Sequence, residues 1–444
     1  MTAVESIPSA RRLIRSLRDM GYDFAQAVAD VVDNAVTAKA TSVCIDLEFE
    51  GDDSWVRIAD NGIGMKPEML REAMRFGSNR DYSEDDLGKF GLGLKTASLS
   101  QCECLSVASR WNRERADIAG YSWDLDHVDR TNRWEIIPLE REQTTAAVRD
   151  PLKDHPGTVV LWRRLDRLLG YKHPYGEASR RRLLQMCREV EVHLSMVFHR
   201  FLAGEAGGRP LRIFVNGNRL APWDPFCRGE EKTKTLQEVT FDLEHEGQTG
   251  KVVFQPFILP PQDAFSSRAA ADAASGPASW NQQQGFYIYR AGRMIQSGGW
   301  SNLRAADEHT KLARVAVFFP PALDDAFKVN VAKMRVQMPA AIRDDIRAAI
   351  TPVVKLAREV YDRRSRLATP GLPKPNGRGQ ASDANAVAAG DKPDHGRPRP
   401  EAGGQNDPSG SGRYTFNEWS TLLLAEARGT EKAVVLKVLR RVRG

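Results

Sequence analysis

Two polar residues in one short stretch, Asp30 and Asn34, have the types and the spacing that a catalytic site requires. On a helix, residues four positions apart lie one turn above the other on the same face. An amide oxygen can ligate a hard cation such as Mg²⁺, and a carboxylate can polarise a water molecule. Asp33 directly precedes Asn34, so its side chain points elsewhere. The pair predicts either a site for a cation and a water molecule or a polar helix face in solvent.

The element that must position this pair is an amphipathic helix. Its apolar residues recur at helical spacing and form one face, made of Phe24, Ala27, Val28, Val31, Val32 and Ala35. A shorter helix is predicted before it over residues 9–20, with Ser9 as its N-cap and Gly21 at its end.

Two glycine motifs follow in a fixed order. The first, Ile58 to Met65, reads IADNGIGM, and the second, Gly88 to Thr96, reads GKFGLGLKT. Together with the Asp30/Asn34 helix they resemble, in order and spacing, the three signature boxes of the GHKL superfamily of ATP-binding domains. Gyrase, the heat-shock chaperone of the ninety-kilodalton class, histidine kinases and MutL belong to that superfamily. A further stretch, Gly157 to Val160, resembles the last box of the family.

The resemblance implies how adenine would be bound. A strand over residues 55–59 places Asp60 at its C-terminal end, where the carboxylate can accept a hydrogen bond from the exocyclic amine. Guanine carries a carbonyl at that position and would be rejected. Beside this aspartate, the resemblance assigns ATP contacts to Gly62, Gly64, Met65 and Thr158, the last through water.

The resemblance also implies a phosphate site. Residues 66–87, with a short helix over 68–76, would form a lid over ATP. The second glycine motif would close over the phosphates with Gly88, Gly91, Leu92, Gly93 and Leu94. Lys95 follows at the start of a helix over residues 94–99. It would add a charge on the phosphates or, alternatively, lie in solvent.

Catalysis is assigned by the same resemblance. Asn34 would coordinate Mg²⁺, and Asp30 takes the position of the usual catalytic glutamate. Aspartate is one methylene shorter, which predicts slow hydrolysis unless Asp33 or a repositioned water molecule compensates. Further strands at 43–49, 101–109, 120–126, 133–139 and 158–162 complete a helix-flanked, largely antiparallel α/β sandwich over residues 1–170.

A second α/β domain is predicted after a connecting helix within residues 171–205. Over residues 206–366 we expect hairpins at 211–217 and 285–295, strands at 237–244, 251–258 and 313–319, a loop at 262–284 and a helix at 340–366. This pattern resembles the transducer domain of MutL, gyrase and MORC proteins. MORC-like bacterial ATP-binding proteins are the closest resemblance, through Gly21-Tyr22, the second glycine motif, the Tyr289-to-Trp300 hairpin and Phe327 to Lys333.

In related transducers a lysine reaches the terminal phosphate of ATP. The resemblance assigns this role to Lys333, with Lys328 as the alternative and a plain surface lysine as the other interpretation. Residues 367–412 are rich in Pro, Gly, Ala, Asp and Asn, which predicts a disordered linker. Residues 413–444 regain an apolar pattern and end in arginines. This predicts a short basic helical module that binds a protein partner or nucleic acid, or folds back on the body.

Composition sets further limits. A hydrophobic content of 41% and a charged content of 27% fit a soluble globular protein without a membrane-spanning segment. The first residues lack an apolar signal-peptide core, so we expect a cytoplasmic location. The five cysteines are scattered, which argues against a disulfide framework. The formal charge of +6 permits contact with nucleic acid without requiring it.

Three functions are compatible with these observations. The favoured hypothesis is an ATP-dependent homodimer whose lid closure drives a DNA-related task in repair or defence, with an ATP-binding switch without turnover as its variant. A chaperone-like ATPase is the second hypothesis, weakened because the chain lacks the large middle and C-terminal regions of the heat-shock class. A histidine kinase is the third, and it is disfavoured because no histidine precedes His127.

Overall fold

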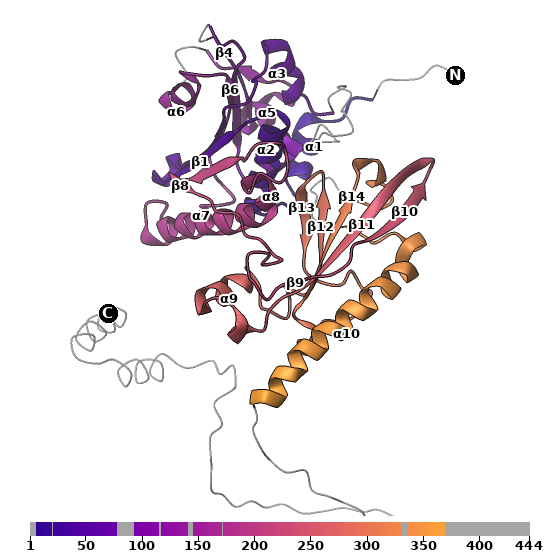
Figure 1. Cartoon of the computed structure of the whole chain (residues 1–444). Helices are drawn as coiled ribbons and strands as arrows, with labels where there is room; N and C mark the ends of the chain where they lie inside the picture. The colour runs from indigo at the N-terminus through magenta and orange to yellow at the C-terminus, as the bar shows by residue number, and fades with distance from the viewer. Residues whose placement is uncertain are drawn as a thin grey trace, which may run out of the picture. The chain divides into compact units, whose positions relative to one another are not determined.

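The computed structural model describes residues 6–19, 21–77, 93–114, 117–140, 145–170, 172–329 and 336–368 (Figure 1). The predicted linker beyond Ala368 and the predicted tail module lie outside these ranges. Within them, none of the helices has both the length and the apolar character that a bilayer span requires. The described part is a mixed α/β structure with two sheets, as predicted.

The first sheet has eight strands in the order β5-β4-β3-β6-β2-β1-β7-β8. Every neighbouring pair is antiparallel except β1 and β7, so the largely antiparallel sheet is confirmed. Its strands are β1 (Ser42–Glu48), β2 (Trp55–Asp60), β3 (Cys104–Arg110), β4 (Ile118–Asp124), β5 (Ile137–Pro138), β6 (Gly157–Arg163), β7 (Arg212–Val215) and β8 (Asn218–Arg219).

The hairpin β7–β8 belongs to this first sheet, whereas the sequence pattern predicted it as part of the second domain. β7 lies parallel to β1 and buries Ile213 and Val215 completely. At its end, the side chain of Asn216 accepts a hydrogen bond from the Leu47 amide at 2.8 Å. The polypeptide therefore returns to the first sheet after the long helix that follows β6.

The helices of this part have recognisable caps. Ser9 caps α1 (Ala10–Arg18), as predicted, and Asp23 forms a capping box with Gln26 at the start of α2 (Phe24–Thr37). The predicted apolar face of α2 is buried. The other helices are α3 (Pro67–Met74), α4 (Gly93–Leu99), α5 (Leu125–Thr131), α6 (Ala146–Arg149), α7 (Glu177–Val197) and α8 (His199–Leu202).

The second sheet follows the order β10-β11-β14-β12-β13, and β9 pairs with β11. Strands β12 and β14 are parallel, while the other pairs are antiparallel. Its strands are β9 (Lys234–Thr235), β10 (Val239–His245), β11 (Gln248–Ile258), β12 (Gly285–Arg290), β13 (Arg293–Ser297) and β14 (Ala313–Phe319). Helix α10 (Arg343–Ala368) packs on β11 and β14 (Figure 1).

One predicted loop, residues 262–284, contains a helix. Ser267 caps α9 (Arg268–Ala274) by accepting from the Ala270 amide, and alanines fill most of the helix. Alanine has the highest helix propensity, so this short helix forms where the polar neighbours indicated a loop. The buried guanidinium of Arg314 donates to the Ala274 carbonyl at 2.6 Å, which fixes the C-terminal end of α9.

Candidate functional site

Asp30 and Asn34 lie one turn apart on α2, as predicted. Asp30 is 4% exposed, whereas Asn34 is exposed. The side-chain amide nitrogen of Asn34 donates to the Asp30 carbonyl at 3.2 Å. This bond uses the nitrogen within the helix, so the amide oxygen is the Asn34 atom suited to a cation.

The carboxylate of Asp30 is held by a residue whose role was not predicted from the sequence. The Tyr22 hydroxyl donates to Oδ2 of Asp30 at 3.0 Å. Burial, and then the Asp30 charge, raises the pKa of Tyr22 far above its usual value, so the phenol remains a donor. A Cβ at Gly93 would lie 3.8 Å from the same Oδ2, which places the start of α4 beside Asp30.

A second unpredicted residue comes from the other sheet. Arg293, at the start of β13, lies with Nε 2.7 Å from Oδ1 of Asp33 and with Nη2 3.7 Å from Oδ1 of Asp30. Asp33 is 1% exposed, and it points away from the exposed face that carries Asn34. Because Asp33 is buried against Arg293 and points away from Asn34, it is unsuited to compensate for the short side chain of Asp30.

Asp60 lies at the end of β2, where the sequence placed it, in register with Thr158 of β6. Its Oδ1 accepts a hydrogen bond from the Gly62 amide at 2.8 Å. Burial raises the pKa of Asp60 to about 6, against the opposing effect of the Gly62 and Thr158 backbone hydrogen bonds. A carboxylate that is short of solvent in this way gains from a ligand that donates a hydrogen bond.

The first glycine motif packs too closely for side chains. A Cβ at Gly64, which has φ +68°, would lie 1.9 Å from the Arg110 carbonyl oxygen. A Cβ at Gly62 would lie 2.9 Å from Oδ1 of Asp60, so glycine keeps that carboxylate accessible. The next residue, Met65, donates its amide to the Ser109 hydroxyl at 2.9 Å.

Ser109 of β3 is a third residue that the sequence motifs did not single out. Its hydroxyl donates to the Gly157 carbonyl at 2.8 Å and lies 3.1 Å from Oγ1 of Thr158. Ser109 and Thr158 are also register partners on β3 and β6. The buried Ser109 hydroxyl thus links Met65 to Thr158, which is the register partner of Asp60.

The phosphate side of the predicted site is described in part. Gly93 and Leu94 begin α4 and are half-buried, while Gly88, Gly91 and Leu92 lie outside the described residues. Lys95 is 2% exposed, so the alternative of a solvated lysine is wrong. Its Nζ donates to the Ala73 carbonyl at 2.9 Å, and burial lowers its pKa to about 8.

Two lysines of the second domain, Lys333 and Lys328, were predicted as alternatives for contact with the terminal phosphate. Lys333 lies outside the described residues. Lys328 is exposed and has φ +48°. Its position therefore neither assigns nor removes a phosphate contact.

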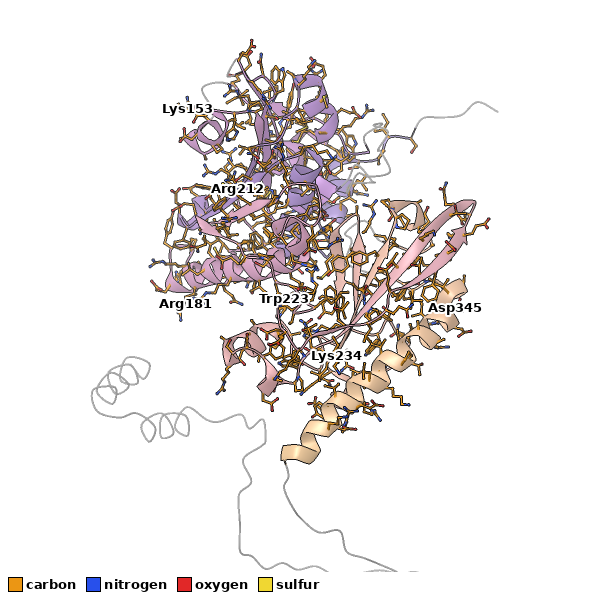
Figure 2. The ribbon with its side chains drawn as sticks, viewed as in Figure 1. Lys153, Arg181, Arg212, Trp223, Lys234 and Asp345 are labelled. Carbon is orange, nitrogen blue, oxygen red and sulfur yellow. The ribbon has the colours of Figure 1, made fainter. Side chains whose placement is uncertain are left out.

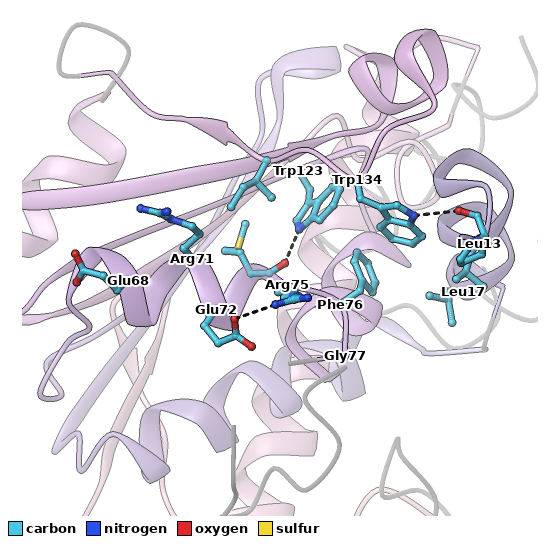
Figure 3. Close-up of a pocket in the computed structure, with 13 residues that line it drawn as sticks. Leu13, Leu17, Glu68, Arg71, Glu72, Arg75, Phe76, Gly77, Trp123 and Trp134 are labelled. Carbon is cyan, nitrogen blue, oxygen red and sulfur yellow. Dashed lines mark hydrogen bonds and ion pairs between the residues drawn. The ribbon is translucent and has the colours of Figure 1, made fainter. Parts of the chain in front are cut away.

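A cavity of about 910 Å³ lies near α3 and away from Asp30, Asn34 and Asp60 (Figure 3). Phe76, Trp123 and Trp134 form edge-on ring contacts along it, with centroids 5.2–6.3 Å apart. The indole nitrogens of Trp123 and Trp134 donate to the carbonyls of Met74 and Pro8. The first bond ties α3 to β4, and the second ties the segment between α5 and β5 to the residues before α1.

The histidines of the long helical segment serve packing. Nε2 of His199 lies 2.8 Å from the Tyr289 hydroxyl, and burial lowers the pKa of His199 to about 4. Burial, and then the charge of Arg293, lowers the pKa of His193 to about 4 as well. Across the described ranges, no group of three or more His, Cys, Asp or Glu side chains is arranged to hold a metal ion.

Comparison with known proteins agrees with this geometry. Residues 22–158 match the family model described as "Histidine kinase-, DNA gyrase B-, and HSP90-like ATPase". The matched range begins at Tyr22 and ends at Thr158, so it contains Asp30, Asn34, Asp60 and both glycine motifs. A search of curated proteins found no significant match. The family match supports an ATP-binding domain of the GHKL type in this part of the chain.

Proposed function

We propose that the protein binds Mg·ATP and hydrolyses it slowly, and that nucleotide-dependent lid closure and homodimerisation drive a DNA-related task. The observation that carries ATP binding is the position of Asp60. Its half-buried carboxylate stands at a strand end beside the Gly62 amide and Thr158, inside the range that matches the family model. The remaining parts of the proposal extend from that site.

The adenine end has the groups that the base requires. Asp60 supplies a charged acceptor for the exocyclic amine. Gly62 and Gly64 allow the close backbone packing that holds this carboxylate at the strand end. Thr158 offers a hydroxyl that can bind the base through water, and the buried Ser109 hydroxyl beside it holds it in place. A carboxylate at this position favours adenine over guanine, because guanine presents a carbonyl instead of a donor.

The cation end fits magnesium through oxygen chemistry. Asn34 is exposed on the same helix face as Asp30, and its amide oxygen is a ligand of the kind that Mg²⁺ accepts. When bound, Mg²⁺ neutralises phosphate charge during transfer to water. The start of α4, at Gly93 and Leu94, lies close to Asp30 and is proposed to face the phosphates.

Asp30 is proposed as the general base that activates water. Tyr22 fixes its Oδ2, which orients the carboxylate but also withdraws electron density from it. Relative to glutamate, its oxygens lie about 1–1.5 Å further back, and misplacement of that size can cost roughly a hundredfold in rate. Slow turnover is the expected consequence, and a nucleotide-held switch without turnover is the limiting case.

The DNA-related task and the dimer rest on the MORC-like resemblance of the chain. The formal charge of +6 is compatible with contact to nucleic acid. Arg181 on α7 and Arg212 at the start of β7 are exposed basic residues of this kind (Figure 2). A chaperone-like ATPase that acts on protein clients is the alternative.

The decisive experiment measures phosphate release from ATP by the wild type and by Asp30→Asn, with and without double-stranded DNA. We expect slow release by the wild type, acceleration by DNA, and loss of release in the variant with ATP affinity retained. Asp46→Asn is the matched control, because Asp46 forms its ion pair with Arg57 on the same sheet and is not one of the proposed site residues. If the wild type binds ATP but releases no phosphate, the ATPase proposal is wrong and the protein is an ATP-binding switch without turnover.

A second experiment addresses assembly. Light scattering with and without a non-hydrolysable ATP analogue should show a doubling of mass when the nucleotide is present. One unchanged mass at concentrations well above the nucleotide dissociation constant would contradict the dimerisation part of the proposal while leaving ATP binding intact.

A further inference from the structure

Among the contacts between the second sheet and the helices of the first part is a buried charge cluster around Arg293. This residue begins β13 in the second sheet, and both carboxylates that it faces belong to α2, which packs on the first sheet. The side chains of Arg293, Asp30 and Asp33 are 5%, 3% and 1% exposed. Since the charges are shielded from water, their mutual attraction is strong, and separating them would leave charges buried without compensation.

The distances give the two carboxylates different roles. Nε of Arg293 lies 2.7 Å from Asp33, whereas its Nη2 lies 3.7 Å from Asp30. Asp33 is therefore the anchor of the guanidinium, and Asp30 interacts with it at longer range. The Phe198 ring, at the end of α7, packs on the same guanidinium, with Cζ 5.6 Å from its centroid.

The two aspartates that pair with Arg293 lie on α2 at or beside the residues proposed to act on ATP. Asp33 is directly followed by Asn34, which we propose as the magnesium ligand, and Asp30 is the proposed base. A shift or rotation of α2 that accompanies nucleotide binding must move at least one carboxylate relative to Arg293. Separating these buried charges has a large free-energy cost. When α2 moves, β13 must therefore move with it or oppose the movement.

We propose that Arg293 is a positioning residue that couples the nucleotide site on α2 to the second sheet through its ion pairs with Asp33 and Asp30. This inference rests on the proposed ATP binding and deepens it, because it names the residue through which nucleotide occupancy reaches the β12–β13 hairpin. Arg293 is not one of the proposed ATP or cation ligands, and it acts through the two aspartates.

The same hairpin provides a matched control. Arg290, on β12, is equally buried and forms an ion pair with Asp324 at 2.7 Å, entirely within the second domain. Replacing Arg290 by glutamine removes a buried ion pair from the same hairpin, as the change at Arg293 does. It leaves the connection to α2 in place.

The test is amide hydrogen exchange of the β12–β13 hairpin, residues 285–297, with and without a non-hydrolysable ATP analogue and Mg²⁺. Nucleotide binding is measured independently by calorimetry. In the wild type we expect the nucleotide to change exchange of the hairpin by about threefold or more. Arg293→Gln should bind the nucleotide and lose that change, Arg293→Lys should keep part of it, and Arg290→Gln should keep all of it.

A double-mutant cycle on unfolding by urea covers the case in which Arg293→Gln does not fold well enough for exchange. Arg293→Lys and Asp33→Asn, alone and combined, should be clearly non-additive. Additive effects, or a nucleotide response that persists in Arg293→Gln, would overturn the inference alone. A wild type that does not bind the ATP analogue would overturn the proposed function, and the coupling inference with it.

Discussion

The hydroxyl of Tyr22 donates to Oδ2 of Asp30 at 3.0 Å, so the carboxylate proposed as the base is held by a neighbour eight residues earlier in the chain. The two residues lie on either side of the capping box that starts α2. Orientation of the proposed base is therefore fixed by local sequence as well as by the packing of the two sheets.

Tyr22→Phe should lower the rate of phosphate release by about tenfold and change the KM for ATP by less than about threefold. The variant loses the donor that orients Asp30, and unfolding free energy should fall by about 1–3 kcal/mol because a buried carboxylate loses a partner. Tyr361→Phe is the control, since that hydroxyl contacts Glu308 at 3.3 Å in the second domain. Equal rates for wild type and Tyr22→Phe would remove Tyr22 from the catalytic arrangement.

Asp60→Asn should weaken ATP binding by at least about tenfold, because the adenine amine loses a charged acceptor worth about 1–3 kcal/mol. Isothermal titration calorimetry measures the effect. The control is again Asp46→Asn, on the neighbouring strand β1. An unchanged affinity in Asp60→Asn would place adenine elsewhere.

The pH dependence of binding tests the same residue. The pKa of Asp60 is raised to about 6 by burial, so lowering the pH from 7 to 5 should protonate it and weaken ATP binding by about tenfold. Asp60→Asn should lack this dependence. The two proteins should be compared at each pH, because the phosphates of ATP titrate in the same range.

The free energy of unfolding should also depend on pH through Asp60, but it should fall as the pH rises, whereas ATP binding should strengthen. A carboxyl with a raised pKa stabilises the folded state below its unfolded pKa near 3.8, and that stabilisation is lost as the pH rises through about 6. Without nucleotide, Asp60→Asn should therefore gain about 1–2 kcal/mol relative to wild type between pH 4 and pH 7. Urea unfolding at both pH values measures it, and a constant difference would contradict the raised pKa.

Gly64→Ala should cost about 3 kcal/mol or more, since the new Cβ would lie 1.9 Å from the Arg110 carbonyl oxygen at φ +68°. Gly77→Ala is a matched comparison, because Gly77 has φ +67° and a Cβ there would meet no heavy atom within 4 Å among the described residues. That variant should lose only about 1 kcal/mol. Urea unfolding of both separates the steric cost from the backbone cost, and equal losses would show that the backbone can relax around Gly64.

Lys95→Met should leave ATP affinity within about threefold of wild type, because Nζ is bound to the Ala73 carbonyl at the end of α3. Burial lowers the Lys95 pKa to about 8, so the unfolded chain binds more protons than the folded one between about pH 8 and pH 10.5. As the pH rises across that range, the free energy of unfolding of the wild type should increase by about 2–3 kcal/mol relative to that of the variant. A large loss of ATP affinity would instead support the phosphate contact predicted from the sequence.

The elements that could be predicted are those whose cause is local. The face of α2 follows from its apolar spacing, and the position of Asp60 follows from a strand that ends at a turn. Ser9 acts as a cap because its hydroxyl accepts from the Arg12 amide three residues later. The residues of α2 and Asp60 also lie within the range that matches the family model.

What could not be predicted depends on distant partners. Arg293 lies 260 positions after Asp33, and nothing in the local sequence of β13 distinguishes it from Arg290, which pairs within its own domain. The sequence left Lys95 either in solvent or on the phosphates. Its actual partner, the Ala73 carbonyl of α3, lies 22 residues earlier, and the glycine motif does not indicate that contact. Ser109 is one of many strand serines until β3 and β6 are placed in register.

The parallel pairing of β7 with β1 determines where the chain can be cut. A recombinant fragment that stops at residue 170 would retain every residue of the matched range but expose the edge of β1 and the contact surface of Ile213 and Val215. Open edges of this kind promote aggregation. A fragment that behaves well should extend past Arg219, which lies about sixty residues beyond the end of the matched range.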